Sequence, residues 1–233
     1  MIPDALEIPL AINLIAVSIG ALGGAIRAGD DERTDIFGLL LLAAVMGFGG
    51  GLVRDILLGN LPPAVLRDPA YILCVLGAAA VGMAFLYYLR KLGPVLWVLD
   101  ALTIGLFACV GANAALVAGL DLAPAVLIGT LASVGGLILA DLLQGRPSSI
   151  LYSGPPNAVA GLAGALIYAV LYPVAGALVT TVAAVAVTFA VRLSGPLLNV
   201  TVPQPRKKAY ELDLKLRAKA KDRKQRKAGP RKP

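Results

Sequence analysis

The sequence lacks histidine and is poor in charged and aromatic residues. None of its 233 residues is histidine, 15% are charged and 6% are aromatic, whereas about 25% of the residues in soluble domains are charged. Without an imidazole the chain has no Ser-His-Asp or Cys-His nucleophile pair and no HExxH metal site. Its glycine-rich stretches lack the GxGxxG and GK[ST] patterns that cradle phosphates. We therefore expect no enzyme activity, no metal and no cofactor.

Cysteine is also scarce. Cys74 and Cys109 are the two cysteines, and both lie inside apolar runs. Free cysteine packs as a small apolar side chain and is among the most buried residue types. The two residues are therefore predicted to be buried core residues rather than partners in a disulfide.

Apolar residues are in excess. They make up 58% of the chain, above the about 45–50% of soluble domains. Most of the apolar runs reach the ~20 residues with which a helix crosses ~30 Å of hydrocarbon. The first run has no basic segment before it, so it is expected to remain as a span rather than act as a cleaved secretion signal. The predicted fold is an all-α membrane protein with seven transmembrane helices, at residues 6–28, 36–58, 70–89, 95–120, 124–143, 158–172 and 174–193.

The net charge of +7 is unevenly distributed along the chain. Residues 204–233 hold 13 of the 21 basic side chains and 3 of the 14 acidic ones, which leaves the rest of the chain slightly acidic. Basic segments stay on the cytoplasmic side of a membrane. Seven spans then place the amino terminus outside the cell membrane and the carboxyl tail in the cytoplasm. The connections that carry Arg27, Arg33, Lys91 and Arg146 fall on the cytoplasmic side.

The basic tail itself has two readings. It is either a solvated segment that sets the topology or a segment that contacts anionic lipid, at ~1 kcal/mol per basic residue near the surface. Tyr210 is its single aromatic residue, which gives little of the aromatic interleaving typical of RNA binding. We expect no nucleic-acid partner.

An internal repeat is the most informative feature. Residues 49–59, GGGLVRDILLG, match residues 135–145, GGLILADLLQG, at a constant offset of 86. Upstream, at an offset of 87, further pairs align: Asn13 with Asp100, Ala21 with Ala108 and Gly24 with Gly111. One unit therefore holds three spans, and because three is odd, the second unit enters the membrane upside down, as in many transporters. The predicted divisions are 1–95 and 96–173 for the repeats, 174–203 for the seventh helix and 204–233 for the tail.

Glycines interrupt the predicted second and fifth helices, at Gly49, Gly50 and Gly51 and again at Gly135 and Gly136. Each costs about 1 kcal/mol of helix propensity relative to alanine. One reading is close packing, because small residues let helices approach each other in lipid. The other is that both helices kink or unwind and turn backbone carbonyls toward a permeation path. Recurrence in the two halves favours the second reading.

Charged residues lie close to these glycines. Arg54 and Asp55 follow the first run by one turn, Asp141 follows the second, and Asp100 lies near the start of the fourth span. An ionised side chain inside the bilayer costs at least a few kcal/mol, so such residues mark candidate solute paths. Arg54 is expected either to line a water-filled path or to pair with Asp55 at the interface. Asp100 is expected to reach the inner surface or to form a buried polar pair with Asn13, its repeat partner.

The motif GGGxxRDxLLG at 49–59, followed by Arg67-Asp68-Pro69, resembles the bacterial glycine-transporter-domain family of the trimeric intracellular cation (TRIC) channel superfamily. The resemblance implies a seven-helix protomer made of two inverted three-helix units and a last helix. It also implies a homotrimer in which each protomer has its own pore, lined by the second and fifth helices. Carried over to this sequence, the pore-lining residues are Gly49, Gly50, Gly51, Arg54, Gly135 and Gly136. The charges near the glycines add Asp55 and Asp141 to the predicted pore-lining or hinge residues.

One position departs from the pattern of this family. Its members commonly have Arg-Asp after both glycine runs, whereas here the second run is followed by Ala140 and Asp141. The pore then holds one fixed positive charge fewer, and Arg146 is a weak substitute. The predicted function is a channel or facilitator for a small solute, either a monovalent cation such as potassium or glycine. The alternative is a structural or assembly membrane protein that transports nothing.

Overall fold

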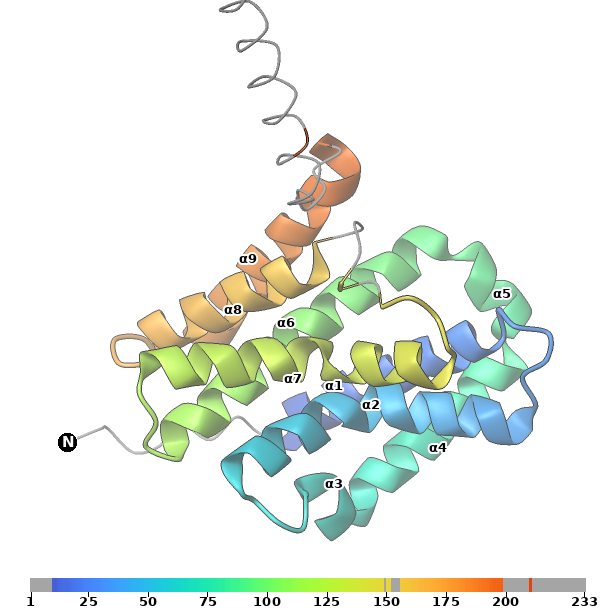
Figure 1. Cartoon of the computed structure of the whole chain (residues 1–233), viewed down its shortest axis with the longest axis horizontal. Coiled ribbons are helices and arrows are strands. Elements are labelled where there is room, and N and C mark those ends of the chain that lie inside the picture. The colour runs from blue at the N-terminus through green and yellow to red at the C-terminus, as the bar shows by residue number, and fades with distance from the viewer. Residues whose placement is uncertain (1–9, 149, 152–155, 199–209, 211–233) are drawn as a thin grey trace, which may run out of the picture.

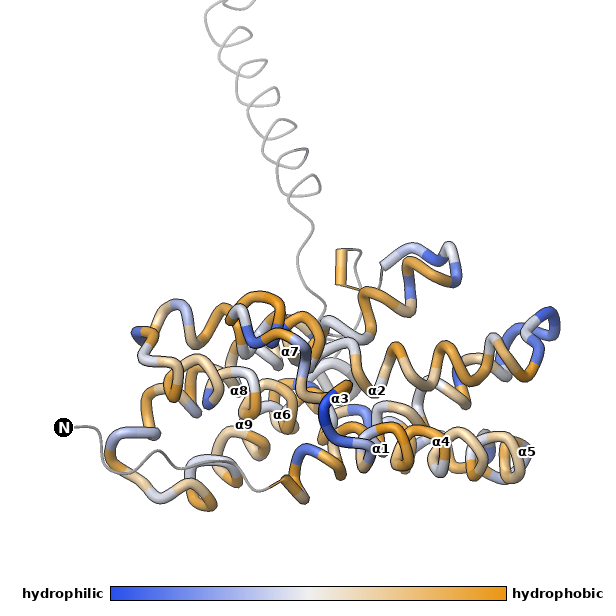
Figure 2. Tube along the Cα trace, turned by 90° about the horizontal axis from the view of Figure 1, so that it is seen from below, coloured by the Kyte–Doolittle hydropathy of each residue, from blue (hydrophilic) through white to orange (hydrophobic). Residues whose placement is uncertain are grey.

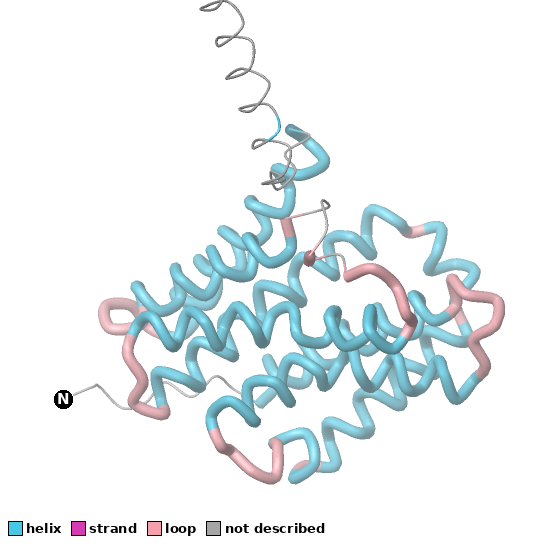
Figure 3. The backbone as a smooth tube through the Cα atoms, viewed as in Figure 1, coloured by secondary structure: helices cyan, strands magenta, loops and turns pink. Residues whose placement is uncertain are grey.

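The described part of the chain is all helical. The computed structural model describes residues 10–148, 150–151, 156–198 and 210, and no strand occurs within them. Most of the helices are long and are joined by short turns (Figures 1 and 3). The helices are α1 (Leu10–Ala28), α2 (Ile36–Leu58), α3 (Ala64–Arg67), α4 (Pro69–Ala84), α5 (Leu86–Lys91), α6 (Gly93–Val117), α7 (Leu122–Leu143), α8 (Asn157–Leu171) and α9 (Ala177–Leu198). The predicted basic tail lies outside the described residues except for Tyr210.

Among the described residues, α1, α2, α6, α7 and α9 are long and apolar enough to cross a membrane. Helices α4 and α8 are apolar but shorter, at 16 and 15 residues. Each predicted span thus overlaps one helix except the third, which overlaps α4 and α5, and the first span begins outside the described residues. The predicted third span, 70–89, is too long, because the backbone of Phe85 (φ −111°, ψ 16°) ends α4 and separates it from α5. The helix that corresponds to the predicted seventh span is α9, which begins at Ala177 rather than at residue 174, after the turn that contains Gly176.

Short capping motifs set the ends of α2 and α4. The carboxylate of Asp35 accepts a 2.7 Å hydrogen bond from a backbone N–H in the first turn of α2. Gly59 ends the same helix with left-handed backbone (φ 71°), a conformation that glycine adopts without strain. Asp68 caps α4 by accepting a 2.9 Å hydrogen bond from the N–H of Ala70.

Small residues fill the core. Helices α2 and α7 pack against each other, α1 packs against α2, α4 and α6, and α8 packs against α6, α7 and α9. Fully buried alanines such as Ala21 and Ala108 belong to two separate core clusters. Helices in lipid associate through close van der Waals packing of small residues, and only a few large aromatic side chains, such as Phe107 and Tyr168, join them in the core of the described residues. Cys109 is buried as predicted, whereas Cys74 is only partly buried, and both thiols are free.

The hydrophilic residues gather mainly in the turns, and the helices between them are mostly hydrophobic (Figure 2). In the turn between α1 and α2, the Arg33 guanidinium donates a 2.9 Å hydrogen bond to the Asp31 carboxylate. This contact holds the pKa of Asp31 below its usual range. The same turn, α5 and the segment after α7 lie at one end of the molecule, and the α6–α7 and α8–α9 turns lie at the other (Figure 1). The basic connections therefore gather at one end.

Glycines that are aligned by the repeat in the sequence make similar contacts in the structure. A Cβ atom added to Gly24 in α1 lies 2.4 Å from the carbonyl oxygen of Leu42 in α2. One added to Gly111 in α6 lies 3.1 Å from the carbonyl oxygen of Ile128 in α7. Leu42 and Ile128 are 86 residues apart, the offset of the repeat. Helix α1 therefore approaches α2 at the same place as α6 approaches α7.

The contact between α2 and α7 is reciprocal. A Cβ atom on Gly50 lies 2.2 Å from the carbonyl oxygen of Ala132, and one on Gly136 lies 2.7 Å from the carbonyl oxygen of Met46. Gly50 with Gly136 and Met46 with Ala132 are both pairs separated by the repeat offset of 86. An exchange of contacts between equivalent residues is typical of a two-fold interface.

Both glycine runs lie inside continuous helices. Helix α2 is unbroken through Gly49, Gly50 and Gly51, and α7 is unbroken through Gly135 and Gly136. The predicted unwinding at these positions is therefore wrong for this structure, whereas the predicted kink stays a prediction. All five glycines are buried, and Gly50 and Gly136 allow each helix to touch the backbone of the other, which is the packing interpretation.

Candidate solute cavity

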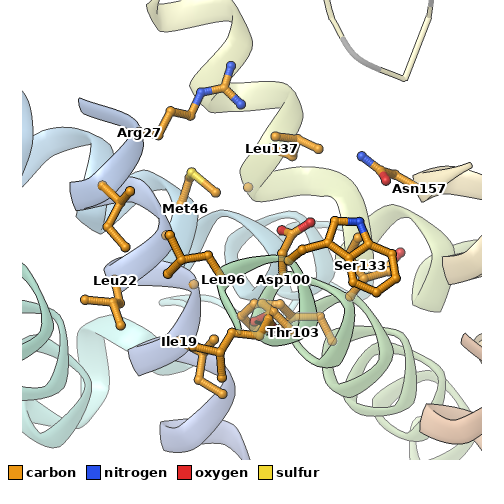
Figure 4. Close-up of a pocket in the computed structure, with 18 of the residues that line it drawn as sticks. Ile19, Leu22, Arg27, Met46, Leu96, Asp100, Thr103, Ser133, Leu137 and Asn157 are labelled. Atoms are coloured by element: carbon orange, nitrogen blue, oxygen red, sulfur yellow. Dashed lines mark hydrogen bonds between the residues drawn. The ribbon is translucent and has the colours of Figure 1, made fainter. Parts of the chain in front are cut away.

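A cavity of about 450 Å³ lies between α1, α6 and α7, and α2, α8 and α9 complete its wall. Apolar side chains from α1 and α2 cover one side, whereas Asp100 and Asn157 lie at the centre and on the opposite side (Figure 4). The charged lining residues are Arg27, Asp30, Asp100 and Arg192, two basic and two acidic. The volume falls within the ~300–1,000 Å³ of small-molecule sites. At ~30 Å³ per water, this volume is large enough for a small solute together with several waters.

Arg192 of α9 reaches across to α6. Its side chain is 3% exposed, and its Nη2 donates to Oδ2 of Asp100, whose side chain is 42% exposed. The guanidinium also lies over the indole ring of Trp97, with Cζ 5.5 Å from the ring centroid. An arginine that combines an ion pair with an aromatic face is well oriented. Helix α9 therefore supplies a well-oriented charged side chain to the cavity wall.

Arg27 of α1 forms the second ion pair at the cavity. Its Nη2 donates to Oδ1 of Asp141 in α7, and its Nε donates a 2.6 Å hydrogen bond to Oε1 of Gln144. Asp141 is 2% exposed and Arg27 is 19% exposed. At the repeat offset of 86, Ala140 is aligned with Arg54, so the second motif has no arginine beside its aspartate, Asp141. In the structure, Arg27 of α1 binds Asp141 in its place.

Among the described residues of the cavity wall, two polar side-chain atoms are buried without a hydrogen-bond partner. They are Nε of Arg192, a donor, and Oδ1 of Asn157, an acceptor. Asn157 is 6% exposed and is the first residue of α8. Burying an unpaired polar atom costs about 1–3 kcal/mol. Within the described residues, no group of three or more acidic or cysteine side chains is placed to hold a metal ion.

Arg54 and Asp55 lie away from this cavity. The Nε of Arg54 donates a 2.7 Å hydrogen bond to Oδ1 of Asp55, and their side chains are 12% and 3% exposed. The second carboxylate oxygen of Asp55 accepts a 2.8 Å hydrogen bond from the backbone N–H of Ala64. The pair therefore anchors the start of α3 to α2. A role of Arg54 in a solute path stays a prediction.

The structure brings some of the predicted residues into the cavity wall and leaves others outside. Gly136 and Asp100 line it, and Asp141 binds Arg27, which lines it. The other predicted residues are outside the wall: Gly49, Gly50, Gly51, Arg54, Asp55, Gly135 and Asn13. The predicted pair of Asp100 with Asn13 is wrong, because Asp100 is bound by Arg192 and the α1 residues in the wall, Ile19 to Arg27, lie further along the helix than Asn13.

Sequence reasoning missed Arg192 and Asn157. Arg192 is the single charged residue of the predicted seventh span, 174–193, and a lone charge inside an apolar span marks a functional site by default. That signal was sufficient to find it. Asn157 had no comparable signal, because a neutral amide at the start of a helix is typical of capping.

The sequence matches the glycine transporter family over residues 10–87 and 97–173. It is similar to a UPF0126 membrane protein of Deinococcus radiodurans, with 38% identity over 141 residues, which cover 60% of this chain and 65% of that protein. A UPF0126 membrane protein of Streptomyces coelicolor is 35% identical over 92 residues, which cover 40% of this chain and 42% of that protein. The matches therefore span less than two thirds of these two relatives. The inner membrane protein YadS of Escherichia coli K12 is 29% identical over 69% of this chain and 77% of its own length.

Solved structures of TRIC channels have the same fold. The TRIC trimeric intracellular cation channel orthologue from Rhodobacter sphaeroides superimposes with a TM-score of 0.75 and 32% identity, covering 82% of this chain and 98% of that one. A TRIC cation channel whose structure explains conductance has a TM-score of 0.75 and 26% identity, covering 83% of this chain and 95% of that one.

The apolar helices and the membrane-protein relatives agree that this is a multi-pass membrane protein. Its structural relatives are channels rather than enzymes. The family match covers more than half of the chain and includes both copies of the glycine motif. The chain belongs to the glycine transporter family.

Proposed function

We propose that the protein is a membrane channel or facilitator for a small solute, either a monovalent cation such as potassium or glycine. The observation that carries the proposal is the charged cavity inside an otherwise apolar helix bundle. Ionisable residues inside transmembrane segments typically mark ion or substrate paths. The fold of TRIC cation channels supports the cation, and the family description supports glycine.

In this proposal, the helix bundle consists of two inverted three-helix repeats and a seventh transmembrane helix. Helices α1 to α4 form the first unit within residues 1–95, α6 to α8 form the second within 96–173, and α9 follows within 174–203. In this proposal, α4 and α8 cross the bilayer along with the five longer helices. The reciprocal contact of Gly50 and Gly136 supports a two-fold relation between the units. The Rhodobacter relative is described as trimeric, and we propose a homotrimer here too.

The proposed orientation follows from the basic connections. They gather at the end of the molecule that holds the cavity residues Arg27 and Asp30. By the positive-inside rule this end faces the cytoplasm. The amino terminus then lies outside the cell membrane, and the cavity is the cytoplasmic half of the path.

The small-residue contact between α2 and α7 closes the path in this conformation. Met46 and Gly136 belong both to the cavity wall and to that contact. Arg54 is eight residues beyond Met46 on α2, which is ~12 Å along a helix. Solute passage therefore requires α2 and α7 to separate at Gly50 and Gly136, so that the cavity connects with the side that holds Arg54 and Asp55.

Reconstitution in liposomes tests this function. Potassium flux and glycine uptake are measured in parallel on the purified full-length protein. Flux of at least one solute above that of empty vesicles supports the proposal, and a loss of potassium conductance in Arg54→Ala assigns that residue to the path. If neither solute crosses, the structural or assembly reading replaces it. Crosslinking in mild detergent tests the trimer, and a strict monomer contradicts it.

A further inference from the structure

The two ion pairs at the cavity differ in which of their members is accessible. In the first pair the side chain of Asp100 is 42% exposed, whereas that of Arg192 is 3% exposed. In the second pair Arg27 is 19% exposed and Asp141 is 2% exposed. Asp100, Arg192 and Arg27 line the cavity, and Asp141 lies outside its wall. The most accessible charge of the two pairs is therefore the carboxylate of Asp100.

The protein itself uses the donors of both arginines. Nε and Nη2 of Arg27 donate to Gln144 and Asp141. Arg192 donates from Nη2 to Asp100, and its Nε is buried. Asp100 accepts from Arg192 through Oδ2, and within the described part of the chain no donor reaches its Oδ1. The carboxylate thus keeps an accessible oxygen for a solute.

Two residues of α6 and two of α9 hold this carboxylate in place. Trp97 and Asp100 are three residues apart in α6, and Phe189 and Arg192 are three apart in α9, a spacing that places side chains on one face of a helix. The rings of Phe189 and Trp97 meet edge to face, with centroids 5.9 Å apart. The guanidinium of Arg192 lies over the same indole ring and binds Asp100. Contacts between α6 and α9 therefore orient the acid.

Asp100 also lies well inside the bundle. It is the eighth residue of α6, ~10 Å along the helix from the first, and Figure 4 shows it at the centre of the cavity lining. An ionised side chain at such a depth is costly and marks a solute path. Its aligned residue in the first repeat, Asn13, is neutral. One repeat alone therefore places a charge at this position.

We propose that Asp100 determines the charge selectivity of the path, because its carboxylate attracts solutes that present a positive group and repels anions. The carboxylate is exposed and the guanidinium of Arg192 is buried, so a solute in the cavity lies nearer to the carboxylate. Coulombic interaction weakens with distance, and the nearer charge sets the sign of the potential. The inference rests on the proposed function and deepens it. It holds for both proposed solutes, since potassium and the ammonium group of glycine are positive.

A cysteine reporter measures the potential in the cavity without any flux. Leu96 lines the cavity four residues before Asp100, which is one turn away on the same face of α6. Leu96→Cys is made in the full-length protein that also carries Cys74→Ala and Cys109→Ala. Its rates of reaction with a cationic and an anionic methanethiosulfonate of similar size are compared in detergent. The protein without Leu96→Cys is the blank.

The two members of the ion pair are expected to change this rate ratio in opposite directions. Asp100→Asn keeps an acceptor for Arg192 but loses the charge, and at ~6 Å and low ionic strength this lowers the cationic-to-anionic ratio by about tenfold. Arg192→Gln removes the opposite charge and raises the ratio. Asp31→Asn is the matched control, an aspartate paired with an arginine at the same end of the molecule but outside the cavity wall. A wild-type ratio in Asp100→Asn, or no reaction of Leu96→Cys with either reagent, overturns the inference.

Permeability measurements separate this inference from the proposed function. Reversal potentials in a gradient of potassium chloride give the potassium-to-chloride permeability ratio, which is expected to fall at least about fivefold in Asp100→Asn and to stay unchanged in Asp31→Asn. For glycine, uptake is compared with that of acetate, which has the carboxylate alone. Flux with unchanged ratios in Asp100→Asn overturns the role of Asp100 and leaves the channel in place. Wild-type protein that passes no solute, but shows the expected cysteine reaction rates, overturns the channel and supports a cavity that repels anions.

Discussion

The close approach of α2 and α7 makes one strong prediction about adjacent glycines. A Cβ atom on Gly50 lies 2.2 Å from the carbonyl oxygen of Ala132, and that atom belongs to the backbone of α7. The nearest neighbour of a Cβ atom on Gly51 is a side-chain carbon of Val65 at 3.8 Å, an ordinary van der Waals contact. The two positions share one helix, one turn and one residue type, so Gly51→Ala is the matched control for Gly50→Ala.

The expected magnitude follows from these distances. To accommodate Gly50→Ala, the two helices must move apart by more than 1 Å, and overpacking of this kind costs about 1–3 kcal/mol. Gly51→Ala makes no clash and gains up to about 1 kcal/mol in helix propensity. In a domain of this size about 1 kcal/mol shifts the melting temperature by ~2–4 °C. Gly50→Ala is therefore expected to melt several degrees below wild type, and Gly51→Ala at or above it.

The assay is thermal unfolding of the two purified variants in the same detergent, followed by size-exclusion chromatography of the heated samples. Gly77→Ala is a second control, because a Cβ atom there has no neighbour within 4 Å. If Gly50→Ala and Gly51→Ala melt at the same temperature, α2 and α7 do not touch at this glycine and the packing interpretation of the glycine run is refuted.

Two further predictions concern the ion pairs. Asp141→Ala removes the partner of Arg27, and because breaking a buried pair leaves an uncompensated charge, the free energy of unfolding is expected to fall by about 3–5 kcal/mol. Asp141→Asn keeps a hydrogen-bond acceptor for Arg27, so its melting temperature is expected to fall less than that of Asp141→Ala. Equal decreases in the two variants contradict the pairing of Asp141 with Arg27. At the surface, the contact with Arg33 lowers the pKa of Asp31, so its stabilising effect is complete above the normal carboxyl pKa and is lost only as pH falls through the lowered value. The difference in melting temperature between Asp31→Asn and wild type should therefore be the same at pH 5 and pH 8, and a difference that shrinks at pH 5 contradicts this reasoning.

Hydropathy and length predicted the long helices well. The predicted span 36–58 coincides with α2, and 124–143 begins two residues inside α7. Continuous apolar runs of this length have few alternatives in lipid, since a helix satisfies all of its backbone hydrogen bonds internally. The end of α4 was missed because Phe85 is as apolar as its neighbours, and hydropathy contains no signal for a local change of backbone angle.

The function of the glycines was predicted less well. Their recurrence at 49–51 and 135–136 identified the two helices that meet at the centre. It did not distinguish a broken helix from a closely packed one, because glycine favours both. The distances from Gly50 to Ala132 and from Gly136 to Met46 settle this point for the structure described here.

Composition and repeat spacing were enough to indicate a helical membrane protein with two related halves, because apolar length and periodicity are properties of the chain read in order. The partners of its charges were not readable in this way. Asp141 finds Arg27 at a separation of 114 residues, and Asp100 finds Arg192 at a separation of 92. These pairs depend on where α1 and α9 cross the bundle, and the crossing is set by how small side chains from several helices fit together at once. A one-dimensional pattern does not encode that fit, so the cavity and its unpaired donor and acceptor emerged from the packed helices.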